Sequence, residues 1–441
     1  MNNNQRMELA RWVSKYALEK GATESAVSIS RSRSVQVDVR EQRLDTIREN
    51  TENSLTLMIY RDFKFSSHTT NNLDRGQLEK FIAGAVEATA YLAPDPDRRL
   101  PDPSLYPTDL GRNLELLDPR QAEVTPEFRV QNAMEAEKLV REVDSRANVI
   151  SASAGFGDNL NEGVRVHSNG FAGAWSSTSF GLSASLSIID GTARPAGGAF
   201  ARTRFLNQLP SVREIAEEAS RNTLMQIGQG PVETGKYTML LDNRVAGNII
   251  GRIFGPMSAR NIHQKNSFLL NKLDSKIGSD LFTITDDPFI PQGLGSRLFD
   301  GEGIAARRRV LIDKGVLKSY LIDNYFGRKL GLTPNGGSTS NIVFALGSRN
   351  REQIIAAQER AILVNSFSGG NASALTGDFS FGISGHLIEN GKITRAINEM
   401  NISGNLLDLW NQLVETGNDP FRFSATQSPT LVFADVIFSG L

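Results

Sequence analysis

The order of helical and alternating segments, which occurs twice, is the feature that most constrains the fold of this chain. Residues 6–20 carry apolar side chains at three- and four-residue spacing, which predicts a helix that Gly21 ends as a C-terminal cap. From 27 to 65 the apolar period changes to two, which predicts half-buried antiparallel strands. A second helix is expected over about 77–92. The unit is therefore helix, several strands, helix.

A second unit with the same order follows a connector, 93–126, which holds seven of the chain's 16 prolines. Thr125 and Pro126 are an N-cap and a first helical residue. The helix that follows buries one stripe of side chains: Phe128, Ala133, Ala136, Leu139, Val140 and Val143. Strand-like runs are expected at 148–155, 163–168, 172–189 and 197–205. A capping box from Ser211 to Glu214 then starts a closing helix, so we expect 127–228 to duplicate 6–92.

Glycine becomes frequent and strands dominate after Gly230 and Pro231, so we place a domain boundary near 230. The expected helices there are 243–256, 353–361 and 404–414. The expected strands include 236–241, 307–312, 316–322, 378–389 and 429–439. The predicted class is α+β, with an N-terminal domain (1–230) of antiparallel sheet flanked by helices and a strand-rich C-terminal domain (231–441).

Composition excludes several classes of function. Lys+Arg number 48 and Asp+Glu 49, which gives a net charge of −1, whereas a dedicated nucleic-acid binder has a strongly basic domain. The chain has no cysteine, which excludes disulfides, thiol catalysis and Cys-type metal sites. No segment reaches the ~18 consecutive apolar residues of a membrane span, and the N-terminus lacks a secretory signal. We therefore expect a cytoplasmic protein with no nucleic-acid or membrane partner.

The histidines do not form a metal motif. His68, His167, His263 and His386 lie far apart, and no His-Glu-x-x-His occurs. A lone histidine is more often a hydrogen-bonded surface or core residue than a ligand, although a site assembled from distant residues stays open. The chain also has no nucleophile elbow, P-loop or dinucleotide fingerprint.

Two glycine clusters are candidate peptide-binding sites. Glycine allows another backbone to approach closely, as in a groove that adds an extended peptide as a strand, and tight turns are the alternative. The candidate contacts are Gly301, Glu302, Gly303, Gly369 and Gly370. We expect valine at 301 and 303 to impair an assembled protease without affecting folding. The arginines 307–309 after the first cluster are interpreted as a solvated strand face with one ion pair, with a phosphate site as the alternative.

Long runs at these clusters resemble the TldD/PmbA family, and in particular its PmbA (TldE) branch, historically described as a modulator of DNA gyrase. The runs that carry the resemblance are 299–303, 307–322, 377–382, 385–393 and 402–406. The resemblance covers essentially the whole chain. It implies a two-subunit cytoplasmic zinc metalloprotease that digests unfolded peptides in an enclosed chamber. Its TldD-type subunit carries zinc through a His-Glu-three-residues-His motif on a helix.

The motif window in this chain falls on 251–256, after the strand 237–241. Gly251 stands at the first histidine position, Arg252 at the glutamate position and Pro256 at the second histidine position. None of the three can bind zinc or act as the base, and Arg252 adds a fixed positive charge. The resemblance therefore implies no catalytic residue, metal or cofactor in this chain, with zinc in a TldD-type partner.

Two functions follow. The first is a non-catalytic PmbA/TldE-like subunit that completes the protease chamber around a peptide substrate. The alternative is a stand-alone homo-oligomer, such as a homodimer, that binds peptides or proteins without protease activity. Binding to DNA gyrase or DNA follows only from the family's historical description, and the even charge balance gives it no support.

Overall fold

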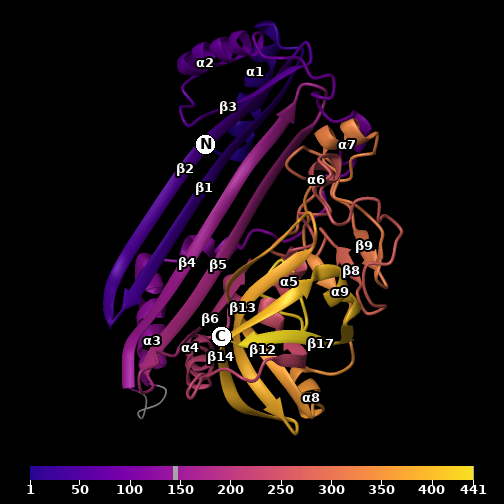
Figure 1. Cartoon of the computed structure of the whole chain (residues 1–441). Coiled ribbons are helices and arrows are strands. Elements are labelled where there is room, and N and C mark those ends of the chain that lie inside the picture. Colours follow the sequence, from indigo (N-terminus) through magenta and orange to yellow (C-terminus); the bar gives the residue numbers. More distant parts are fainter. Residues whose placement is uncertain (143–147, 441) are drawn as a thin grey trace.

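A long N-terminal sheet lies beside a strand-rich C-terminal domain in the computed structural model, which describes residues 1–142 and 148–440 (Figure 1). The sheet has six strands in the order β3-β2-β1-β4-β5-β6, and all neighbours are antiparallel. The strands are β1 (Glu24–Arg40), β2 (Arg43–Arg61), β3 (Lys64–Thr70), β4 (Asn148–His167), β5 (Ala172–Ile189) and β6 (Ala196–Thr203). Because β1 pairs with β4, the two units expected from the sequence are the two halves of one sheet.

The strand β4 corrects one expectation. Residues 148–155 and 163–168 were expected as two strands, but both belong to β4. The residues between them, 156–162, have lost the alternation, yet they pair with β1 on one side and β5 on the other. The ladder hydrogen bonds of two neighbours keep this segment extended where its own sequence gives no strand signal.

Four helices cover the sheet in two pairs, one at each end (Figure 1). They are α1 (Asn3–Glu19), α2 (Arg75–Thr89), α3 (Pro126–Glu142) and α4 (Val212–Leu224). The first pair packs on Ile29 of β1 and Val164 of β4, and the second pair on Val37 of β1 and Phe156 of β4. The second unit thus repeats the element order of the first, while duplication as its origin stays a prediction.

Local signals set the helix ends as expected. Gly21 takes a φ of +105° after α1. The Thr125 hydroxyl accepts a backbone N–H from the first turn of α3 at 3.1 Å. Ser211 and Glu214 form the expected capping box of α4. Val143, also expected on α3, lies outside the described residues.

The proline-rich connector joins the two units of the N-terminal domain and contacts both domains. The described residues of the connector before α3 form two short 3-10 helices, η1 (Pro103–Leu105) and η2 (Pro119–Glu123). A third 3-10 helix, η3 (Leu206–Gln208), lies outside the connector and follows β6. The Leu116 carbonyl accepts the Thr178 N–H of β5 at 2.9 Å, and the Leu105 carbonyl accepts the Ala305 N–H of the C-terminal domain at 2.8 Å. The connector therefore lies extended between the domains and hydrogen-bonds to both.

Two sheets form the described C-terminal domain. The first has the order β14-β13-β12-β7-β17-β15, and an additional β14–β17 pairing closes five of its strands into a ring. These strands are β7 (Gly235–Leu241), β12 (Arg360–Ala372), β13 (Asp378–Glu389), β14 (Lys392–Asn405), β15 (Leu413–Thr416) and β17 (Leu431–Gly440). The second sheet has the order β10-β9-β8-β11-β16. Its strands are β8 (Ile284–Asp286), β9 (Arg309–Asp313), β10 (Val316–Leu317), β11 (Ile342–Phe344) and β16 (Thr426–Gln427).

The C-terminal helices are shorter than expected. They are α5 (Asn243–Gly251), α6 (Ala259–His263), α7 (Asn324–Leu330), α8 (Arg351–Ala356) and α9 (Leu406–Asn411). The helix expected over 243–256 ends at Gly251, because two glycines and Pro256 disfavour a further turn. The helix expected over 353–361 ends at Ala356, since Ala361 already pairs with β7. None of the described helices has the length and apolar character to cross a bilayer.

Candidate functional site

The helix α5 carries the motif window at its C-terminal end. Asp242 caps its N-terminus by accepting the Arg244 N–H at 3.0 Å. Gly251 is the last helical residue, and the window continues into a turn that ends at the buried Pro256. The Arg252 guanidinium lies over the Phe381 ring of β13, 5.2 Å from its centroid. The aromatic face thus holds the cation at the position where the resemblance implies a glutamate.

The second glycine cluster lies against the same aromatic residue. Gly370 has a φ of +114°, and a Cβ there would come within 2.2 Å of the Ser380 carbonyl oxygen and 2.6 Å of the Phe381 Cα. The β12–β13 register shifts at this point, so the cluster is an irregularity inside a strand. Gly369, with a φ of +128°, has open space on its Cβ side. The structure therefore brings Arg252 and Gly370 together on Phe381, which their separation in sequence did not indicate.

The first glycine cluster is a turn that packs against the N-terminal sheet. The Asp300 carboxylate accepts the N–H groups of Glu302 at 2.8 Å and Ile304 at 3.0 Å. Gly303 has a φ of +75°, and a Cβ there would lie 2.9 Å from His167 Cε1. The expectation that valine leaves folding intact is therefore wrong for Gly303. Gly301 has no atom within 4 Å of its Cβ position, so it is the position at which valine would be informative.

Acidic groups are buried beside this turn. Burial, together with the nearby carboxylates of Asp300 and Asp323, raises the pKa of Glu302 to about 7, even though the Asn324 N–H donates to Glu302 at 2.8 Å. Burial also raises the pKa of Asp300. Burial lowers the pKa of Arg165, which lies close enough to act electrostatically on both acids. The turn is thus a site where protonation changes stability.

We expect Glu302→Gln to stabilise the protein at pH 8 by about 2 kcal/mol relative to the parent, and by much less at pH 5. The raised pKa means that the folded parent loses stability as pH rises from the ordinary glutamate pKa toward 7, because the unfolded chain ionises first. Glutamine keeps an acceptor for the Asn324 N–H and removes the buried charge. Urea unfolding at both pH values measures the effect, with the exposed Glu217→Gln as control. An equal effect at the two pH values would refute the role of the buried charge.

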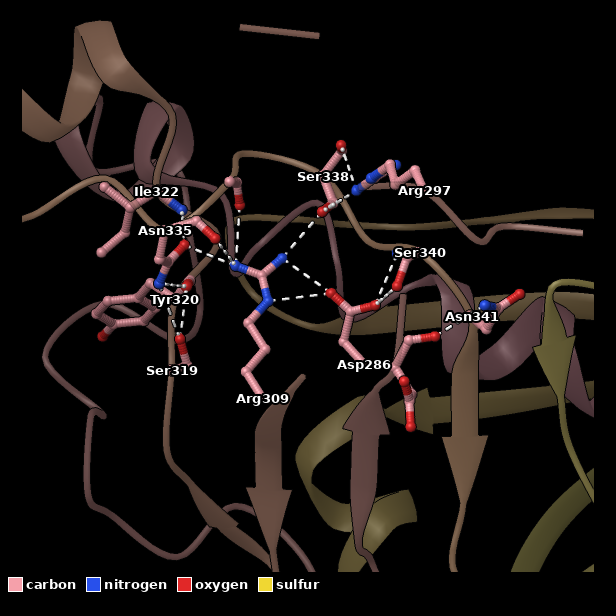
Figure 2. Close-up of polar contacts among 12 residues, drawn as sticks. Asp286, Arg297, Arg309, Ser319, Tyr320, Ile322, Asn335, Ser338, Ser340 and Asn341 are labelled. Carbon is pink, nitrogen blue, oxygen red and sulfur yellow. Dashed lines mark hydrogen bonds and ion pairs between the residues drawn. The ribbon is translucent and has the colours of Figure 1, made fainter. Parts of the chain in front are cut away.

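The arginines after the first cluster match the expected solvated face only in part, because Arg307 and Arg308 are exposed whereas Arg309 is half-buried. Arg309 Nε lies 3.0 Å from Asp286 Oδ2, and its other nitrogens donate to the carbonyls of Asn335, Gly336 and Ser338 (Figure 2). Arg308 pairs with Asp287 at 3.2 Å, so two of the three arginines are paired. Arg309 uses its N–H donors in hydrogen bonds within the protein, so few of them remain to bind a phosphate. The missed partners come from segments far away in sequence.

The histidines behave as expected for structural residues in three cases. His68 Nε2 lies 2.8 Å from Ser66 Oγ. His167 Nδ1 lies 3.0 Å from the Tyr106 hydroxyl, and burial, aided by Arg165, lowers its pKa to about 3. His386 contacts Asn365 Oδ1 at 2.6 Å. His263 is exposed.

Within 1–142 and 148–440, no group of three or more His, Asp or Glu side chains is arranged to hold a metal ion. The expectation that this chain carries no metal stays a prediction.

Three cavities that share Arg204 lie between the described parts of the sheet and of the C-terminal domain. One of about 830 Å³ is bounded by α5 through Asn243, Arg244 and Gly247. Two others, of about 710 and 810 Å³, share Arg204 with it. Gly301 lines the cavity of about 710 Å³, whereas Gly369 and Gly370 line none of the three. Sequence reasoning missed this region because its walls come from β6, the connector and segments 290–301 and 420–428.

The comparisons with known proteins agree along the chain. Models of the PmbA/TldA metallopeptidase family match residues 26–89 (domain 1), 119–227 (central domain) and 234–440 (C-terminal domain). Metalloprotease PmbA of Escherichia coli O157:H7 is 28% identical over 96% of this chain and 94% of its own length.

Solved structures show the same fold over the whole chain. A Bacteroides thetaiotaomicron protein assigned by name as a modulator of DNA gyrase is 39% identical, covers 100% of both chains and has a TM-score of 0.96. TldE from Thermococcus kodakarensis has a TM-score of 0.85 at 21% identity over 98% of this chain and 99% of its own, which shows the shared fold alone.

Proposed function

Because this chain belongs to the PmbA/TldD (PmbA/TldA) metallopeptidase family, we propose that it is a non-catalytic, PmbA/TldE-like subunit of a cytoplasmic zinc protease that acts on unfolded peptides. In this proposal the zinc belongs to a TldD-type partner subunit. The chain contributes a wall of the chamber in which the peptide is held.

The content of the motif window carries this proposal. Gly251 offers no side-chain ligand and Pro256 offers no donor atom for a metal. Arg252 cannot lose its proton at working pH, so it would repel a cation and cannot serve as a base. The residues present therefore do not fit a zinc ion, and we derive no catalytic step through zinc on this chain.

The position of α5 supports a structural role at the site of cleavage. Asn243, Arg244 and Gly247 of α5 border the 830 Å³ cavity, so the helix faces an open space ahead of its motif window, whose residues line none of the three cavities. Of the predicted peptide contacts, Gly303 and Gly370 have packing reasons for being glycine. Gly301 and Gly369 have open space on their Cβ sides. These two glycines are therefore the ones that we propose contact the peptide.

Co-purification tests the proposal. We expect the tagged chain, isolated from its own host, to bring down a second chain of similar size that contains the His-Glu-three-residues-His motif. Native mass spectrometry of the eluate gives the mass of the assembly, and the same isolation with the untagged chain is the control. An assembly that contains only copies of this chain would favour the homo-oligomeric binding module instead.

A further inference from the structure

The three cavities that share Arg204 are lined by an excess of positively charged side chains, although the whole chain has a net charge of −1. Eight arginines and four carboxylates line the cavities together, and no lysine or histidine does. Charge of one sign around a low-dielectric cleft focuses the field and raises the local concentration of ligands of opposite sign. The excess of positive charge is therefore a property of this region and not of the chain's overall composition.

Most of the lining arginines lack an acidic partner. Arg31 pairs with Glu162, which also pairs with Arg6, and Arg244 pairs with Glu218. The other six lining arginines have no carboxylate oxygen within 4.0 Å among the described residues. Buried charges in proteins are usually paired, so guanidinium groups without a carboxylate partner indicate that the balancing negative charge comes from a ligand.

Arg202 and Arg204 lie where the cavities meet. Both line the 830 and 810 Å³ cavities, and Arg204 also lines the third. Arg204 donates to the carbonyls of Thr178 at 3.1 Å and Leu294 at 2.6 Å, which holds its side chain in place. Arg202 is exposed and uses one N–H, to Ser179 Oγ at 3.1 Å, so four of its five donors stay available.

Electrostatics of the pair favours an anion. Burial and the adjacent Arg202 charge lower the pKa of Arg204 to about 10, so the two guanidinium groups repel each other. A carboxylate between them would relieve that repulsion and accept charge-assisted hydrogen bonds. The fixed Arg204 is organised before binding, which reduces the entropy lost when a ligand docks.

The rest of the lining fits an extended chain with side chains of mixed character. Trp175, Phe421 and Phe423 give aromatic surface, while Ser32 and Ser177 add hydroxyl groups. Each cavity falls in the range of ligand pockets, 300–1,000 Å³ as a rough guide, and the cavities lie in series through Arg204. Neighbouring cavities that share lining residues suit a ligand in extended form.

We propose that these cavities select peptides that carry carboxylates, with one carboxylate bound between Arg202 and Arg204. The peptide nature of the ligand rests on the proposed function, and the charge preference rests on the arginines. Acidic side chains and a free C-terminus offer the same chemistry, and the experiment below separates them.

Fluorescence anisotropy on the full chain tests the preference. The probes are a labelled ten-residue unstructured peptide with four glutamates, its counterpart with four glutamines, the amidated form of each, and a ten-nucleotide single strand. We expect the glutamate peptide to bind about tenfold more tightly than the glutamine peptide at low salt, with the difference shrinking as salt rises. If the amidated glutamate peptide still binds more tightly than the amidated glutamine peptide, the bound carboxylates belong to side chains. If amidation abolishes binding of the glutamine peptide, the free C-terminus is a bound carboxylate as well.

The variants localise the site. Arg202→Gln should weaken glutamate-peptide binding about tenfold and leave the melting temperature unchanged, since its one internal bond is to a serine hydroxyl. The matched control is Arg213→Gln, an exposed arginine of α4 that lines none of the cavities, which should bind as the parent does.

Several outcomes would overturn the inference. Equal binding of the glutamate and glutamine peptides would remove the charge preference. Equal losses from Arg202→Gln and Arg213→Gln would place the binding elsewhere, and tighter binding of the oligonucleotide would identify a different ligand class. The assay contains no partner subunit and no cleavage, so its failure is distinguishable from failure of the co-purification that tests the proposed function.

Discussion

Arg129→Met is expected to lower the free energy of unfolding by about 3–5 kcal/mol. Arg129 of α3 is 3% exposed and Asp158 of β4 is 1% exposed. Arg129 Nε lies 2.5 Å from Asp158 Oδ2, and Arg129 Nη2 lies 3.1 Å from Asp158 Oδ1. Without the guanidinium, the carboxylate stays buried with only a 3.3 Å contact from the Gln121 amide. The loss of an ion partner inside the sheet–helix interface is the reason for the size of the effect.

Urea unfolding followed by tryptophan fluorescence measures this prediction. The double variant Arg129→Met with Asp158→Leu should recover most of the loss, because neither partner is then left charged and alone. The exposed ion pair of Arg213 and Glu217 gives the control, since Arg213→Met should cost less than about 0.5 kcal/mol. A loss below about 1 kcal/mol for Arg129→Met would show that the pair contributes little to holding α3 on the sheet.

We expect the rate of peptide cleavage to rise at least about 100-fold when a second, TldD-type subunit is present. The reason is that a metal-bound water supplies hydroxide at neutral pH. In the proposed register, Gly251, Arg252 and Pro256 stand at the positions of a metal ligand, its base and a second ligand, so these residues would have no means of generating the attacking hydroxide. A quenched fluorescent peptide incubated with this chain, with a TldD-type partner and with both gives the three rates to compare. Added chelator on the mixture is the control, and it should abolish cleavage. Comparable cleavage by this chain alone would contradict the assignment.

Sequence periodicity predicted the elements whose signal is local. The strands β5 and β13 have the bounds that alternation predicted, and the capping box at Ser211 marks the start of α4. The α+β class, the antiparallel N-terminal sheet and the strand-rich C-terminal region are confirmed. Errors arose where tertiary pairing decided the outcome, as in the unbroken β4 and in residues 360–361, which join a sheet rather than a helix.

The site was only partly predictable, for the same physical reason. The placement of the motif window at 251–256 rests on the fixed spacing of a metal-binding helix and stays a prediction. The contact of Arg252 with Phe381, the packing of Gly303 on His167 and the internal bonds of Arg309 all join residues that are far apart in the chain. The cavity arginines were missed because Arg202 and Arg204 alternate like any polar strand face, and the opposite walls belong to other domains of the sequence.

Zinc content per chain is the measurement that tests the central claim most directly. The chain is purified alone in zinc-containing buffer, and separately as the complex isolated from its host, and both are analysed by native mass spectrometry with metal quantification. We predict no stoichiometric zinc on the isolated chain and about one zinc per pair of unlike chains in the complex, held by the partner's ligands. Stoichiometric zinc on the isolated chain would contradict the account, because it would require a metal site that residues 251–256 cannot form.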